Sequence, residues 1–317
     1  MMSREEVEKY KSLIPLVDDL ERAKIMMLLE YDRVEKCNES FIYFASHMWP
    51  GFISGKHHQI MANAFERVAK GELKRLIINM PPRHTKSEFA SFLLPAWFLG
   101  KFPEKKIIQT AHTAELAVGF GRKVRNLVSS ETYSRIFDTK LSSDSKAAGR
   151  WNTDRGGDYF AIGVGGAVTG KGADLLIIDD PHSEQEAKQG NPAVFDNVYE
   201  WYTSGPRQRL QPGGSIVIVM TRWSKRDLTG RVLQSMVERD GDEWEVISLP
   251  AILPTGKPLW PEFWSHDELE KLRNELPISK WSAQYQQDPS SEEGALVKRE
   301  WWKVWDKESP PACAFIL

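Results

Sequence analysis

The chain opens with a helical pattern and changes near residue 75 to a pattern of buried strands. Apolar residues recur at three-to-four spacing over residues 4–13 and 18–31, which predicts two helices, the second capped by Asp18. From about residue 75, short runs of apolar residues alternate with helical stretches. These runs predict strands at 76–78, 107–108, 175–178, 216–219 and 246–247. Strands that are apolar throughout and alternate with helices predict a parallel sheet covered on both faces.

The pattern of residue types changes again after Pro250. Four more prolines follow by residue 277, and the charged segment 266–275 predicts another helix. A stretch rich in Trp, Tyr and Gln comes next, and the pattern therefore predicts a second, smaller unit. The last residues, ESPPACAFIL, combine a Pro-Pro linker with an apolar run that is typical of the beginning of a strand.

Composition indicates an ordinary globular protein. Of the 317 residues, 41% are apolar and 27% are charged, which argues against intrinsic disorder. The net charge of −2 gives no overall positive field, so a nucleic-acid surface would have to be local. Two cysteines, Cys37 and Cys313, are too few for a disulfide scaffold and indicate a reducing compartment. The sequence has neither a signal-like start nor an apolar run of about 18 residues, and a cytosolic protein without a membrane partner is expected.

The strongest chemical signal lies in residues 76–94, LIINMPPRHTKSEFASFLL. An apolar strand leads into a short loop that ends in Lys86 and Ser87, and an apolar helix follows. A phosphate-binding loop has this context: its backbone N–H groups and its Lys contact phosphates, and its hydroxyl contacts Mg²⁺. Met80 and Thr85 stand where the usual pattern has glycine. A strand followed by a capped helix with an incidental Lys-Ser pair is the alternative explanation.

Two further strands supply residues that suit the same site. Asp179 and Asp180 follow a buried run, and one could hold Mg²⁺ while the other orients or deprotonates a water. Glu184 is a second candidate base. The strand SIVIVMTRW ends in Thr221 and Arg222. Because parallel strands deliver their carboxyl ends to one crevice, Thr221 is expected to face Lys86 and Asp179. A polar turn and an ordinary strand end are the simpler alternatives.

Several ordered motifs together resemble the large terminase subunit of tailed double-stranded DNA phages, and its ATPase half in particular. They are GELKRLIINMPPRHTKSE, VTGKGADLLIIDDP, MTRW, LPAILP, LWPEFW and WSAQYQQDP, and the resemblance extends over about residues 40 to 310. It implies an α/β P-loop NTPase fold of the additional-strand catalytic-acid type, with a mostly parallel sheet flanked by helices and a small helical lid. The implied divisions are 1–37 (helices contributing to the lid), 38–257 (ATPase core), 258–309 (lid and linker) and 310–317 (start of a nuclease domain).

The resemblance also assigns roles to residues. ATP would contact the loop residues Pro82, Arg83, His84, Thr85, Lys86, Ser87 and Glu88; Mg²⁺ would contact Ser87 and Asp179. Asp180 would be the catalytic carboxylate, with Thr221 and Arg222 coupling hydrolysis to movement. Gln59 matches an adenine-sensing position.

An arginine is expected to neutralise charge on the transferred phosphoryl group. Arg83 is the candidate within the chain, and Arg150 and Arg155 are the candidates for action across a ring interface. The Gly-rich segment 163–174 leads into a strand rather than a helix, which predicts a tight turn. Lys171 in this turn is a possible phosphate or DNA contact.

The implied function is ATP-driven threading of double-stranded viral DNA through a portal protein into a procapsid, together with a small terminase subunit. The location would be the host cytoplasm rather than the finished virion. A homo-oligomeric ring is expected on assembly, and a monomer is possible in isolation. A related DNA helicase or translocase and a non-enzymatic nucleotide-binding assembly module remain alternatives. Because the chain ends where a nuclease domain would begin, no metal-dependent DNA cleavage is expected from it.

Overall fold

A single sheet forms the centre of the molecule. The structure is a computed structural model that describes residues 1–185, 193–239 and 241–289. Within these residues eight strands pair in the order β3-β4-β5-β2-β6-β7-β1-β8, and five of the seven pairings are parallel. The strands are β1 (Arg75–Asn79), β2 (Lys106–Ala111), β3 (Leu141–Ala147), β4 (Arg150–Thr153), β5 (Asp158–Gly163), β6 (Ala173–Asp179), β7 (Leu210–Met220) and β8 (Glu245–Ser248). The mostly parallel sheet and the five predicted strands are thereby confirmed. The antiparallel edge made by β3 and β4 was not predicted.

The order of the central strands matches the predicted fold class. Strand β7 lies between β1, which precedes the phosphate loop, and β6, which ends at Asp179. Ile77 of β1 is level with Ile218 of β7, and Ile177 of β6 is level with Val217. The inserted β7 is the additional strand of the predicted P-loop NTPase type. Its carboxyl end is therefore held between the loop and the carboxylates.

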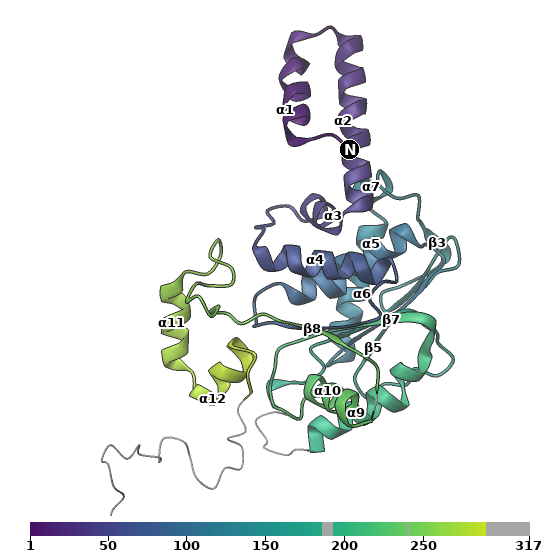
Figure 1. Cartoon of the computed structure of the whole chain (residues 1–317). Coiled ribbons are helices and arrows are strands. Elements are labelled where there is room, and N and C mark those ends of the chain that lie inside the picture. Colours follow the sequence, from purple (N-terminus) through teal and green to yellow (C-terminus); the bar gives the residue numbers. More distant parts are fainter. Residues whose placement is uncertain (186–192, 240, 290–317) are drawn as a thin grey trace, which may run out of the picture.

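Helices cover both faces of the sheet, as the apolar strands predicted (Figure 1). Leu76 and Ile78 belong to one core cluster with residues of α3 (Phe41–Met48), α4 (Lys56–Ala69), α5 (Leu94–Lys101) and α6 (Ala114–Val128). Ile77 faces the other way, into a second cluster with α9 (Ala193–Ser204) and α10 (Leu228–Arg239). Shorter elements are η1 (Ile14–Leu16), η2 (Glu88–Leu93), α7 (Glu131–Ser134) and η3 (Pro206–Arg209).

The two ends of the described chain lie far apart. Figure 1 shows α1 (Arg4–Leu13) and α2 (Asp19–Glu39) as a hairpin that projects from one end of the molecule. The pattern predicted these two helices, and the second continues past the predicted end at residue 31. The predicted helix 266–275 is α11 (His266–Glu275), which lies on another side with α12 (Ile278–Lys280) and η4 (Trp281–Tyr285). Among the described residues, the N-terminal hairpin and α11 lie on different sides of the core, and the predicted division of the chain into lid and ATPase core stays a prediction.

Packing explains this separation. Helix α2 is anchored to the core by its last turn, where the indole N–H of Trp97 donates to the carbonyl of Cys37 at 2.9 Å. The unit that contains α11 has its own small core of Ala251, Leu269 and Trp281. We call residues 250–289 the C-terminal unit. The predicted boundaries at 309 and 310–317 lie outside the described residues. Among the described helices, none is long and apolar enough to cross a membrane.

Candidate functional site

The predicted phosphate loop joins β1 to a helix, as a loop of this type requires. Residues 80–87 leave the sheet after Asn79, and the chain continues as a π-helix, η2, and then α5. Two loop residues, Arg83 and Thr85, have φ angles of 60° and 68°, in the left-handed region that glycine adopts most readily. Left-handed residues set among right-handed ones turn successive N–H groups toward one side, which forms a concave site for an anion. The two positive φ angles therefore agree with the predicted phosphate loop, although glycine is missing.

Lys86 is a buried cation held by a carboxylate. Its Nζ lies 2.8 Å from Oδ2 of Asp180, and the residue is only 6% exposed. The other oxygen of Asp180, Oδ1, accepts the backbone N–H of Thr221 at 2.7 Å. Thr221 in turn donates its hydroxyl to the carbonyl of Met80 at the base of the loop. The predicted site residues from three strand ends are thus connected to one another.

Asp179 lies beneath this group and is bound by two serines. Ser87 donates to its Oδ1 at 2.9 Å, and Ser91 donates to its Oδ2 at 2.7 Å. Ser91 is fully buried and accepts a hydrogen bond from the side chain of Gln109. Burial, with the neighbouring charge of Asp180 as the second cause, raises the pKa of the Asp179 carboxyl above its ordinary value. The carboxylate is therefore costly to ionise unless a cation compensates it.

These groups suit a magnesium ion. Mg²⁺ prefers oxygen ligands and is bound in nucleotide sites by one or two carboxylates together with phosphates and waters. The Asp179 carboxylate and the Ser87 hydroxyl are 2.9 Å apart, so both oxygens are available at one point of the loop. Burial and the nearby Asp180 raise the pKa of Asp179, so a bound cation would favour its ionised form. The residues present thus fit the predicted ion.

An aromatic cavity of about 410 Å³ opens beside the loop. Loop residues Arg83, Thr85, Lys86, Ser87 and Glu88 form one side of it, and Trp49, Phe52, Trp260 and Phe263 contribute aromatic rings. Trp260 and Phe263 stack on each other with their ring centroids 4.4 Å apart. Flat apolar walls next to an anion site are suited to a nucleobase attached to phosphates.

Other predicted residues lie around this centre with partners of their own. Gln59 is exposed on α4 and donates to Asn63; it does not line the cavity. Glu184 forms an ion pair at 2.5 Å with Lys280 of the C-terminal unit. The guanidinium of Arg222 pairs at 2.9 Å with Asp227. The roles expected for Gln59, Glu184 and Arg222 stay predictions.

The predicted interface arginines lie far from the loop. Arg150 is exposed on β4, and Arg155 is exposed and paired with Asp138. Five strand spacings separate β4 from β1, which is about 24 Å across the sheet. Neither arginine can therefore reach the loop of its own chain. Lys171 belongs to the turn before β6 and pairs with Asp158 at 2.7 Å.

Sequence reasoning missed three residues that hold the site together: His58, Ser91 and Gln109. Ser91 follows Ser87 by four residues, so the two share a helix face, and this spacing was a usable signal. Gln109 is a polar residue directly after the two isoleucines of β2, which was a weaker signal. His58 contacts the loop from α4, and nothing in the local sequence indicates that contact.

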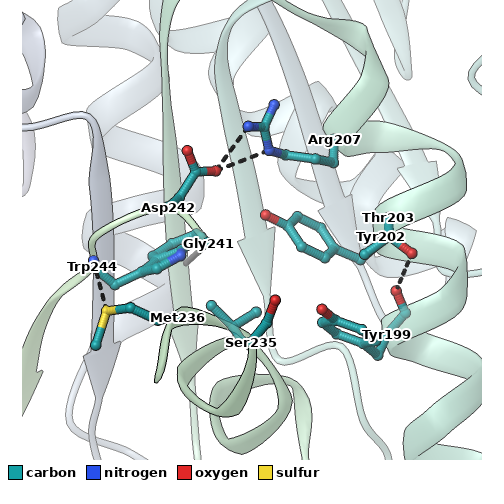
Figure 2. Close-up of a pocket in the computed structure, with 10 residues that line it drawn as sticks. Tyr199, Tyr202, Thr203, Arg207, Ser235, Met236, Gly241, Asp242 and Trp244 are labelled. Carbon is teal, nitrogen blue, oxygen red and sulfur yellow. Dashed lines mark hydrogen bonds and ion pairs between the residues drawn. The ribbon is translucent and has the colours of Figure 1, made fainter. Parts of the chain in front are cut away.

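A second cavity, of about 460 Å³, lies by the residues that precede β7 and β8 (Figure 2). Figure 2 shows Tyr202 and Trp244 on its walls, with Arg207 and Asp242 paired at 2.8 Å. Arg75, the first residue of β1, pairs with the same carboxylate at 2.9 Å. Ligands of open parallel sheets bind at the carboxyl ends of the strands, whereas this cavity lies at the amino ends. The predicted phosphate loop is therefore the candidate functional site.

Comparison with known proteins gives structural matches only. No model of a protein family and no curated protein sequence matches the chain. The large terminase of bacteriophage HK97 matches with a TM-score of 0.49 and 12% identity, covering 75% of this chain and 51% of that chain. The large terminase ATPase domain of Thermus phage P74-26 matches with a TM-score of 0.45 and 15% identity, covering 72% and 93%. The large terminase of the thermophilic bacteriophage D6E in complex with ADP matches with a TM-score of 0.47 and 9% identity, covering 70% and 52%.

These neighbours are members of the family that the sequence motifs resemble. The chain spans about half the length of the HK97 and D6E terminases that it matches. At identities of 9–15% the likeness is one of fold.

Proposed function

We propose that the chain is an ATP-hydrolysing motor domain that drives double-stranded viral DNA into a procapsid. One observation carries the proposal. A loop with left-handed residues brings Lys86 and Ser87 against Asp179 and Asp180, and the inserted strand adds Thr221 to the same group. Phosphoryl transfer from ATP needs these parts: an anion cradle, a lysine, a metal-binding carboxylate and a carboxylate that orients water.

The triphosphate would bind in the concave backbone of the loop, with the base against the rings of Trp260 and Phe263. Lys86 would contact the β- and γ-phosphate oxygens. Ser87 and Asp179 would hold Mg²⁺, which would neutralise negative charge on the bound phosphates. In this arrangement the nucleobase would occupy the cavity and the phosphates would face the strand ends.

Asp180 would orient the attacking water and accept its proton. Its oxygen Oδ2 is 2.8 Å from Lys86, so phosphates that attract Lys86 also release this carboxylate. Its oxygen Oδ1 stays bound to the N–H of Thr221, which fixes the direction of the carboxylate. Any shift of Asp180 during turnover therefore acts directly on the end of β7. This link supports the proposed coupling role of Thr221 and Arg222.

The proposed motor needs partners. They are the double-stranded DNA, a portal protein with its procapsid, and a small terminase subunit. Arg150 and Arg155 are exposed and too distant for their own loop, which supports a role across a subunit interface in a ring. Arg83 is exposed at the mouth of the cavity and is the candidate within the chain.

ATP turnover tests the proposal. The purified chain is assayed for phosphate release, alone and with DNA, procapsids and small subunit, and packaged DNA is measured by protection from nuclease. Lys86→Ala should abolish turnover and packaging. Lys105→Ala is the matched control. Lys105 also pairs with a carboxylate, Asp174 at 2.9 Å, but this pair lies at the amino ends of β2 and β6, away from the loop. Nucleotide binding without turnover in any mixture would support an assembly module, and strand separation on a forked duplex would support a helicase.

A further inference from the structure

The phosphate loop carries a strained residue at a key position. Thr85 directly precedes Lys86 and has a φ of 68°, in the left-handed region. For a β-branched residue this conformation is a genuine outlier, because its Cβ crowds the backbone, whereas glycine adopts it freely. Such strain persists only where the surrounding structure holds it in place. Something outside the loop backbone must therefore stabilise Thr85.

A buried histidine from α4 supplies this support. Nε2 of His58 lies 2.7 Å from Oγ1 of Thr85, and Nδ1 of His58 accepts the backbone N–H of Gly55 at 2.8 Å. Since Nδ1 accepts, Nε2 carries the hydrogen and donates it to Thr85. The Thr85 hydroxyl then donates its own hydrogen to the carbonyl of His84, at 2.5 Å. Every polar atom of the His58 and Thr85 side chains therefore has a hydrogen-bond partner.

The ring of His58 is itself immobilised. It is fully buried, and its centroid lies 4.7 Å from Phe89, 4.8 Å from Phe52 and 5.0 Å from Trp260. Phe89 belongs to η2, the helix that follows the loop, and Trp260 lines the aromatic cavity. The histidine thus joins α4, the loop and the cavity wall in one packed group. Desolvation by burial lowers its pKa to about 2, so the donor and acceptor roles are constant at neutral pH.

We propose that His58 is a positioning residue that replaces the missing glycine: by holding the Thr85 hydroxyl, it keeps the loop in its phosphate-binding conformation. This inference rests on the proposed nucleotide site. It concerns the affinity of the loop for the β- and γ-phosphates and not the chemistry of hydrolysis. Without the hydrogen bond, Thr85 would relax toward negative φ, and the N–H groups of the loop would lose their common direction.

A double-mutant cycle tests the proposal. The affinity for a fluorescent ATP analogue is measured for His58→Ala, Thr85→Gly and the double variant. In the Thr85 background, His58→Ala should weaken binding about tenfold, which is the effect of ~1.4 kcal/mol. In the Thr85→Gly background the same substitution should change affinity less than about twofold, because glycine needs no support. Thr85→Ser should bind more tightly than Thr85→Ala, since it keeps the hydroxyl.

Met61→Ala controls for loss of packing in α4. Met61 is fully buried on the same helix, one turn beyond His58, and packs in the apolar core. Thermal unfolding of each variant shows whether it folds, and the Thr85→Ser and Thr85→Ala pair provides a test if His58→Ala does not. Equal losses from His58→Ala in both backgrounds, or equal binding by the serine and alanine variants, would overturn the proposal. Failure of the unmodified protein to bind ATP would instead refute the proposed function.

Discussion

Three buried histidines, two on α4 and one in the predicted phosphate loop, make the stability of this protein sensitive to acid. Burial lowers the pKa of His57 to about 3, of His58 to about 2 and of His84 to about 4. In the unfolded chain each ring titrates near 6.5. Below pH 6.5 the unfolded state therefore binds protons that the folded state cannot bind, so stability falls as the pH falls.

The magnitude follows from proton counting. Between pH 6 and pH 5 the three histidines bind up to three protons in the unfolded state only. Asp179 has the opposite sign, because its raised pKa lets the folded protein take up one proton first. The net difference is about two protons, or ~3 kcal/mol of unfolding free energy per pH unit. This is a large part of the 5–15 kcal/mol that is usual for a protein domain.

Urea unfolding followed by tryptophan fluorescence at pH 7, 6 and 5 measures this slope. His57→Leu is the diagnostic variant. The ring of His57 packs against Trp260, with ring centroids 5.2 Å apart, and leucine has nearly the same volume as histidine but does not titrate. It should reduce the slope between pH 6 and 5 by about one proton. Unfolding free energies that agree within ~1 kcal/mol at pH 7 and 5, or an unchanged slope in His57→Leu, would refute the reasoning.

Three further predictions concern the site and its surroundings. Ser91→Ala removes a hydrogen-bond donor to Asp179 and leaves the side chain of Gln109 with one partner fewer. It should therefore raise the Mg²⁺ concentration needed for half-maximal ATP hydrolysis several-fold, and an unchanged Mg²⁺ titration would contradict this role. Phe263→Ala should raise the KM for ATP about tenfold, because the ring lines the cavity and stacking on a base contributes ~1–3 kcal/mol. The melting temperature should change little, because the ring is 51% exposed. An unchanged KM would argue against a base in this cavity. Asp227→Ala should lower the unfolding free energy by ~3–5 kcal/mol, measured by urea unfolding, because it leaves the Arg222 guanidinium without its buried partner; a loss below ~1 kcal/mol would show that water replaces the carboxylate.

The sequence by itself determined the sheet and which candidate residues meet at the ends of its strands. Continuous apolar runs that alternate with helical stretches are typical of a parallel sheet covered on both faces, so the five strands could be predicted from the pattern. Lys86, Asp179 and Thr221 could be assigned to one site because parallel strands end at one edge. The hydrogen bond from Ser87 to Asp179 and the contact of Thr221 with Asp180 agree with that reasoning.

Only the tertiary structure decided which side chains support those residues. The pairing of Lys86 with Asp180 and the support of Thr85 by His58 join segments that are 94 and 27 residues apart, and local pattern carries no information about such contacts. The separation of the N-terminal hairpin from the C-terminal unit likewise depends on which apolar surfaces find each other. A missing glycine is visible in the sequence, but the histidine that compensates for it becomes visible only when α4 packs against the loop.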